Sequence, residues 1–147
     1  MKKIIAILLF TALYGVSQAQ FALPKIDTKS VESATSALKN FVKPPAIGDV
    51  GGTAGTIVDM LSSKLSLPAA LKPKLISAVS GFLTNKKSIT GLADTNPTGY
   101  LAKFNPLQKG LFGKLKGIMG TSAFTKMLGL KPTGSDIAGN ALSNLFF

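Results

Sequence analysis

The side chains that could perform chemistry in this 147-residue chain are lysines, hydroxyls and a few carboxylates. The sequence contains 17 lysines but no arginine, histidine, cysteine or tryptophan. The chain therefore lacks an imidazole base, a thiolate nucleophile, a zinc cluster and a disulfide. Its six carboxylates are scattered, at Asp27, Glu32, Asp49, Asp59, Asp94 and Asp136. We therefore predict no enzymatic activity, no catalytic residue, no metal site and no bound cofactor.

Two short motifs match known signatures only in part. Ser36 and Lys39 fit the Ser-x-x-Lys pattern, in which a lysine one helical turn away activates a serine. The chain lacks the Ser-Asp-Asn and Lys-Thr-Gly motifs that accompany this pattern in penicillin-binding proteins and β-lactamases. Residues 48–55 are rich in glycine, but no Lys-Ser or Lys-Thr pair follows Gly55, as a phosphate-binding loop requires. We predict a flexible connection between two helices there.

The most informative segment is 109–131, which combines apolar residues, glycines and lysines at helical spacing. At 100° per residue, five apolar side chains fall within an arc of roughly 120°. This candidate apolar face comprises Leu111, Phe112, Leu115, Ile118 and Met119. The candidate contacts with an anionic surface are Lys109, Lys114, Lys116 and Lys126. The segment resembles cationic amphipathic membrane-active peptides that begin Gly-Leu-Phe, and this resemblance implies a contact with anionic lipid.

Four glycines lie opposite that face and argue against a free, membrane-lying helix. They are Gly110, Gly113, Gly117 and Gly120. Each glycine in a helix costs about 1 kcal/mol relative to alanine, so we expect a neighbouring element to approach this bare face closely. The apolar pattern also shifts after Gly120, because Phe124, Met127 and Leu128 project onto the side of the glycines. Two short helices packed within a bundle explain both observations.

Apolar residues at helical spacing, separated by glycines and prolines, recur along the rest of the chain. No segment shows the alternation of a strand. The expected helices span residues 28–42, 53–65, 66–85, 97–119 and 121–128, with a last helix from 135 and a polar connector over 86–96. Pro73 indicates either a kink or a late start at Lys72, and Pro106 indicates a break or a kink. We predict an all-α, compact bundle of five to seven short helices.

The first 19 residues have the pattern of a secretory signal peptide. Lys2 and Lys3 precede an apolar run over 4–14, and Ser17 and Ala19 supply the small residues of a cleavage site. We expect residues 20–147 to form a single helical domain with 15 lysines and six acids, a formal charge of +9. No later segment is long and apolar enough to be a transmembrane span. The predicted location is the periplasm or the external medium.

The lysines are the remaining functional signal. Because nucleic-acid surfaces commonly use arginine for phosphate and guanine contacts, we expect no nucleic-acid partner. A lysine-rich surface keeps an apolar domain in solution, and it also attracts acidic envelope polymers or anionic lipid surfaces. We therefore predict an exported, non-catalytic helical binding or structural module. The alternative is a membrane-active cationic amphipathic protein that acts on anionic lipid surfaces.

Overall fold

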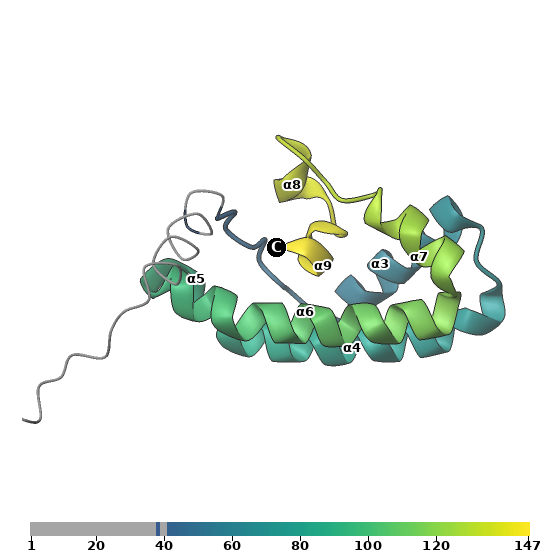
Figure 1. The fold of residues 1–147 in the computed structure, drawn as a ribbon, viewed down its shortest axis with the longest axis horizontal. Helices are drawn as coiled ribbons and strands as arrows, with labels where there is room; N and C mark the ends of the chain where they lie inside the picture. The colour runs from purple at the N-terminus through teal and green to yellow at the C-terminus, as the bar shows by residue number, and fades with distance from the viewer. Residues whose placement is uncertain (1–37, 39–40) are drawn as a thin grey trace, which may run out of the picture. The chain divides into compact units, whose positions relative to one another are not determined.

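A computed structural model of the chain describes Leu38 and residues 41–147, and Figure 1 shows how their helices are arranged. Within these residues the chain forms seven α-helices, one 3-10 turn and no strand, which confirms the all-α prediction for this part of the chain. The predicted signal peptide at 1–19 and most of the predicted helix 28–42 lie outside the described residues. Phe41 and Val42, the expected end of that helix, are not helical.

Helix α3 (Val50–Leu65) begins earlier than the sequence predicted. The Asp49 carboxylate accepts a hydrogen bond from the backbone N–H of Gly52 and so caps the first turn. The predicted connection at 48–55 is therefore wrong from Val50 onward, because its glycines belong to the first turns of α3. The helix ends at Ser66, which has a left-handed backbone (φ 51°) and donates its N–H to the Ser62 carbonyl.

Helix α4 (Lys72–Ile89) follows a 3-10 turn, η1 (Ala69–Leu71). Pro73 lies in its first turn, where the missing N–H of proline has no helical partner to lose. The late start is thus the correct one of the two alternatives for Pro73. The helix continues past residue 85, and the short α5 (Leu92–Thr95) follows it. The predicted polar connector over 86–96 is therefore wrong.

Helix α6 (Pro97–Met119) is the longest in the described part of the chain. Pro97 opens it as predicted, and the Asn96 side chain accepts a hydrogen bond of 2.9 Å from the N–H of Gly99. The helix continues through Pro106, so of the two alternatives for this proline, a break or a kink, the break is wrong. Pro106 is exposed, so the backbone hydrogen bond that proline cannot donate is missing on the solvent side of the helix. Gly120, with φ 84°, separates α6 from α7 (Thr121–Leu128).

Helices α4 and α6 lie side by side as an antiparallel pair (Figure 1). Helix α3 packs on α4, and α7 turns back from α6 to contact α3. These helices enclose a hydrophobic core whose fully buried members include Leu61, Leu75, Leu83, Leu115 and Met127. Full burial of each such side chain contributes roughly 1.5–3 kcal/mol. Among the described helices, all the others pack on one side of the α4–α6 pair, and none covers the other side, which we call the open side (Figure 1).

The predicted last helix is two single turns, α8 (Asp136–Gly139) and α9 (Ser143–Phe146). Asn140 separates them with an extended backbone. Leu142 and Leu145 are buried, and the side chain of Gln108 in α6 donates a hydrogen bond of 2.9 Å to the Leu145 carbonyl. The α9 turn is therefore docked against α6.

Candidate anion-binding face

The α4–α6 layer, defined as Lys72–Ile89 and Pro97–Met119, carries charge of one sign only. Each helix contributes four lysines, and neither contains an aspartate or a glutamate. The acids of the described residues lie on other elements, at Asp49, Asp59, Asp94 and Asp136. The Lys72 ammonium pairs with Asp59 at 2.8 Å, and the second ion pair, Lys43 with Asp94 at 2.7 Å, lies outside the layer. Within the described residues, seven of the eight lysines of the layer have no carboxylate partner.

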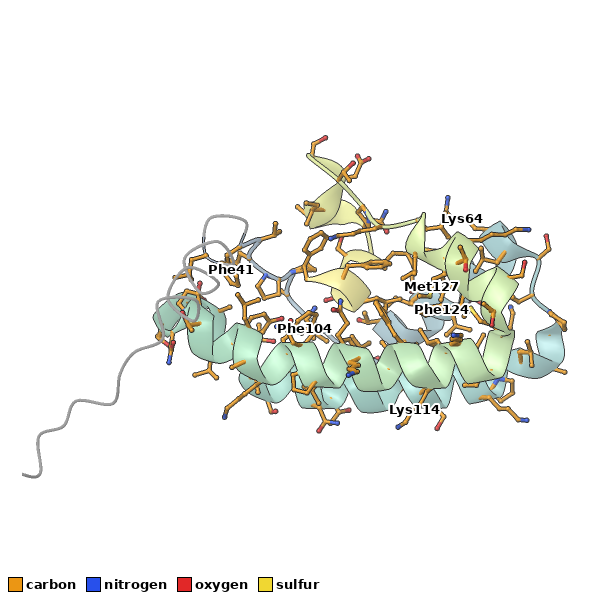
Figure 2. The ribbon with its side chains drawn as sticks, viewed as in Figure 1. Phe41, Lys64, Phe104, Lys114, Phe124 and Met127 are labelled. Atoms are coloured by element: carbon orange, nitrogen blue, oxygen red, sulfur yellow. The ribbon has the colours of Figure 1, made fainter. Side chains whose placement is uncertain are left out.

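Five of these lysines are exposed and make no ion pair with a described residue, and we call them the free lysines. The free lysines are Lys74, Lys103, Lys109, Lys114 and Lys116. Lys87 is also exposed, but its ammonium donates to the Gly48 carbonyl at 2.9 Å. Figure 2 shows Lys114 directed away from the bundle, whereas Lys64 of α3 lies on the opposite side. The open side of the layer is therefore cationic.

The free lysines of α6 form two rows along the helix. At 100° per residue, Lys109 and Lys116 are about 20° apart, and so are Lys103 and Lys114, whereas the two rows are separated by at least about 120°. The exposed residues between the rows are Ala102, Pro106, Gly110, Gly113 and Gly117. An extended anionic chain could contact both rows without meeting a bulky side chain.

The described residues do not supply the close neighbour that we expected at the glycine face. A Cβ added at Gly110, Gly113 or Gly117 would meet no atom of a described residue within 4 Å. The reason is that the apolar arc on the other side of α6 faces the core and turns the glycines toward solvent. Leu111 and Leu115 are buried there.

The rest of the candidate apolar face packs against the same core, with Phe112, Ile118 and Met119 partly buried. The Phe112 ring lies 5.7 Å from the ring of Phe124 and 5.8 Å from that of Phe146. The structure thus places the candidate apolar face inside the bundle. Of the candidate lysines, Lys109, Lys114 and Lys116 are exposed on α6, and Lys126 is exposed on α7, outside the layer.

A shallow hollow of about 680 Å³ lies between α4 and α6 on the cationic side. It is lined by Pro73, Lys74, Ser77, Ala78, Lys114, Gly117 and Ile118. Two free lysines therefore flank a largely apolar floor. Sequence reasoning missed Lys74 because it lies 40 positions from Lys114. The available signal was the absence of acids over 60–93 and 95–135.

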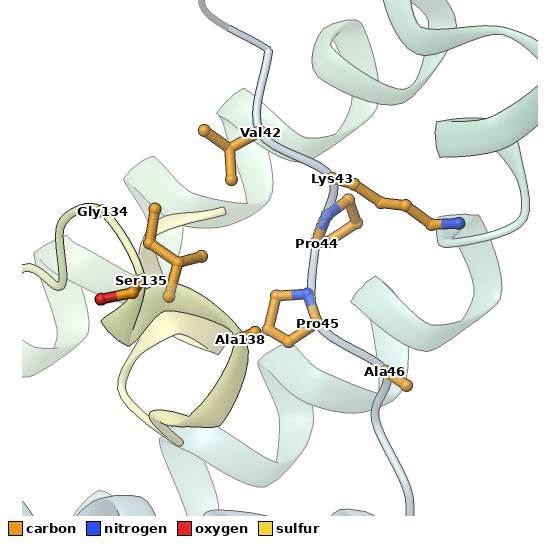
Figure 3. Close-up of a pocket in the computed structure, with 9 residues that line it drawn as sticks. Val42, Lys43, Pro44, Pro45, Ala46, Gly134, Ser135 and Ala138 are labelled. Carbon is orange, nitrogen blue, oxygen red and sulfur yellow. The ribbon is translucent and has the colours of Figure 1, made fainter.

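A second hollow, of about 660 Å³, lies between the extended segment 42–46 and α8 (Figure 3). Its lining is mainly apolar, and Ser135 supplies a hydroxyl. The Lys43 side chain points away from α8, and its ammonium is paired with Asp94. Among the residues that line this hollow, no carboxylate lies beside a free basic side chain that could act with it.

Lys86 is the most unusual cation of the layer, because its side chain is completely buried. Its Nζ donates to the Asn144 carbonyl at 2.9 Å and to the Asn144 Oδ1 at 3.3 Å, and it lies 5.6 Å from the centre of the Phe104 ring. Burial lowers the pKa of Lys86 to about 7, because desolvation penalises the charged form. Sequence reasoning placed this residue in the expected polar connector and so missed it.

The other candidates from the sequence are not assembled into a site. Ser36 and Lys39 lie outside the described residues. Among the residues that are described, no three carboxylates gather into a cluster that could hold a metal ion, and no helix is long and apolar enough to cross a membrane. Comparison with protein-family models, curated proteins and solved structures finds no match to this chain.

Proposed function

We propose that this chain is an exported, non-catalytic binding module, and that the open side of its α4–α6 layer binds an acidic envelope polymer. One observation carries the proposal: two neighbouring helices hold eight lysines and no carboxylate, and five of these lysines are exposed and unpaired among the described residues. Like charges gathered on one face repel one another and attract a polyanion.

The dimensions of α6 fit a polymer better than a single small anion. At 1.5 Å per residue, the free lysines from Lys103 to Lys116 extend over about 20 Å of the helix. The strip between their two rows contains only small residues and Pro106. Carboxylate or phosphate groups repeated along a chain could therefore meet several ammonium groups in succession.

The membrane-active alternative has less support. Its apolar face is Leu111, Phe112, Leu115, Ile118 and Met119, which pack into the core. On the open side of α6, the strip between the two lysine rows offers no large apolar side chain, and Ile118 at the adjoining hollow is only partly exposed. Membrane activity would require the bundle to open.

The proposal can be tested by measuring the binding of the full chain to an acidic polysaccharide, a neutral polysaccharide and anionic vesicles at several salt concentrations. We expect binding to the acidic polysaccharide that weakens as salt rises, and no binding to the neutral polymer. A Lys74→Gln, Lys114→Gln double variant should bind roughly 30-fold more weakly, since two lysines near an anionic surface contribute about 1 kcal/mol each.

The matched control is a Lys64→Gln, Lys126→Gln variant, which removes the same charge from exposed lysines of α3 and α7. We expect its affinity to change by less than about twofold, because these lysines lie outside the layer. Equal losses in the two variants would show that net charge, and not the layer, drives binding. Leakage of anionic vesicles without polysaccharide binding would favour the alternative function.

A further inference from the structure

The contact between Lys86 and Asn144 joins elements that are far apart in the sequence. Lys86 lies in α4, and Asn144, 58 positions later, lies in α9. Both residues are buried, and the Lys86 Nζ donates to both oxygens of Asn144. The α9 turn therefore covers Lys86, and undocking of α9 would return this side chain to water.

The hydrogen-bond geometry at Nζ matches a neutral amine. A neutral lysine has two N–H groups, and the structure provides two acceptors, both from Asn144. A charged ammonium has a third N–H, for which the described residues provide no oxygen or nitrogen acceptor; the Phe104 ring, whose centre lies 5.6 Å from Nζ, is beyond hydrogen-bond distance. Burial of an ammonium without a counter-ion and with an unmet donor is strongly unfavourable.

No charged group on the neighbouring elements compensates for this burial. No carboxylate oxygen of a described residue lies within 4.0 Å of the Lys86 Nζ. On α3, Asp59 pairs with Lys72, and Asp49 caps its own helix. On α6, Tyr100 stacks on Phe104, and burial raises the pKa of its hydroxyl, which stays neutral.

The remaining titratable groups of the surrounding elements are also directed elsewhere. The neighbouring Lys87 donates to Gly48, and Asp94 of α5 pairs with Lys43. The terminal carboxylate at Phe147, next to α9, forms no ion pair with Lys86. The positive charge that protonation places on Lys86 is therefore not compensated by a negative group of any described residue.

We infer that Lys86 is a proton-sensitive clasp: α9 docks over the neutral amine, and proton uptake by Lys86 favours undocking of residues 140–147. A lysine in water titrates near 10.5, and burial moves the pKa of Lys86 to about 7. The free energy that favours docking of α9 therefore increases as pH rises from 7 toward 10.5. Below pH 7 this free energy is smallest and no longer changes with pH. Undocking would expose Leu142 and Leu145.

Amide hydrogen exchange of the full chain at pH 6.0 and pH 8.5 tests the clasp. The reporters are amides whose hydrogen bonds hold the turn, those of Ser143, Asn144, Leu145 and Phe147. After correction for the chemical exchange rate, their protection should be about 30-fold greater at pH 8.5, as linkage requires for these two pKa values.

Two variants separate the clasp from ordinary packing. Lys86→Met keeps an apolar side chain of similar length, so its protection should be equal at the two pH values. Gln108→Ala removes the hydrogen bond to the Leu145 carbonyl without removing a titratable group. In this variant the α9 amides should be less protected than in the wild type at both pH values. The roughly 30-fold ratio between their protection at pH 8.5 and at pH 6.0 should remain.

Equal protection of wild-type α9 at the two pH values would overturn the clasp, as would a pH ratio that persists in Lys86→Met. If that variant does not fold, an NMR titration of the Lys86 side chain in the wild-type protein decides the question. A midpoint of the Lys86 titration below pH 8 supports the clasp, and a midpoint at pH 8 or above overturns it.

Discussion

Lys86 places a charge-bearing group in the core where no described carboxylate can pair with it. Because its pKa is lowered on folding, the folded chain binds fewer protons than the unfolded chain between pH 7 and 10.5. The free energy of unfolding should therefore rise with pH across this window and stay level below it. The full effect is about 5 kcal/mol at most, from the size of the pKa change.

Lys86→Met should remove this dependence and stabilise the fold most at pH 6, where the wild-type lysine carries its charge at the greatest energetic cost. Urea denaturation at pH 6, 7.5 and 9 measures the effect below the range in which Tyr100 titrates. Lys87→Met is the matched control, because Lys87 is the exposed neighbour of Lys86 on the same helix. A wild-type free energy of unfolding that falls between pH 7 and 9, relative to Lys86→Met, would contradict the prediction.

At the scale of the helix, the exposed glycines of α6 reduce its stability without serving a packing role in the described structure. Gly110→Ala, Gly113→Ala and Gly117→Ala should each stabilise the protein by roughly 0.5–1 kcal/mol, because alanine loses less backbone entropy and has space for its Cβ. Thermal unfolding followed by circular dichroism measures the gain. Gly120→Ala is the contrasting control, since φ at Gly120 is 84° and alanine there should destabilise.

The start of α3 depends on one side chain. Asp49→Ala should destabilise the protein by about 1 kcal/mol, because the N–H of Gly52 then loses its acceptor. Chemical denaturation measures this loss. Asp136→Ala serves as the control, because no side chain caps the α8 turn to which Asp136 belongs. An equal effect at both positions would mean that negative charge, and not the cap, is responsible.

For the whole molecule, the formal charge of +11 and the clustering of lysines on one layer give salt two opposite effects. Raising sodium chloride from about 10 mM to 300 mM shortens the Debye length from about 30 Å to less than 10 Å. Repulsion among the free lysines then weakens, so the thermal midpoint should rise by a few degrees. The same salt should weaken polyanion binding. A variant with Lys74, Lys103, Lys109 and Lys114 changed to Gln should show a smaller rise, and calorimetry measures both midpoints.

Much of the local structure could be predicted from the sequence, because local residues determine it. Pro97 opens α6 and Gly129 follows the end of α7, as their backbone preferences indicate. The burial of Lys86 could not be predicted, since it depends on a turn 58 positions away. Nor could the hollow at Lys74 and Lys114, which requires the antiparallel alignment of α4 and α6. The low helix propensity of the outward glycines suggested a close neighbour, which the described residues do not provide.

The α4–α5–α6 hairpin is continuous in sequence, whereas α9 must return from a distance to reach α4. Contacts between nearby residues require little loop-closure entropy, so we expect the hairpin to form early in folding and α9 to dock last. Substitutions in the seam between α4 and α6 should then slow refolding, while those at Leu142 or Leu145 should mainly accelerate unfolding.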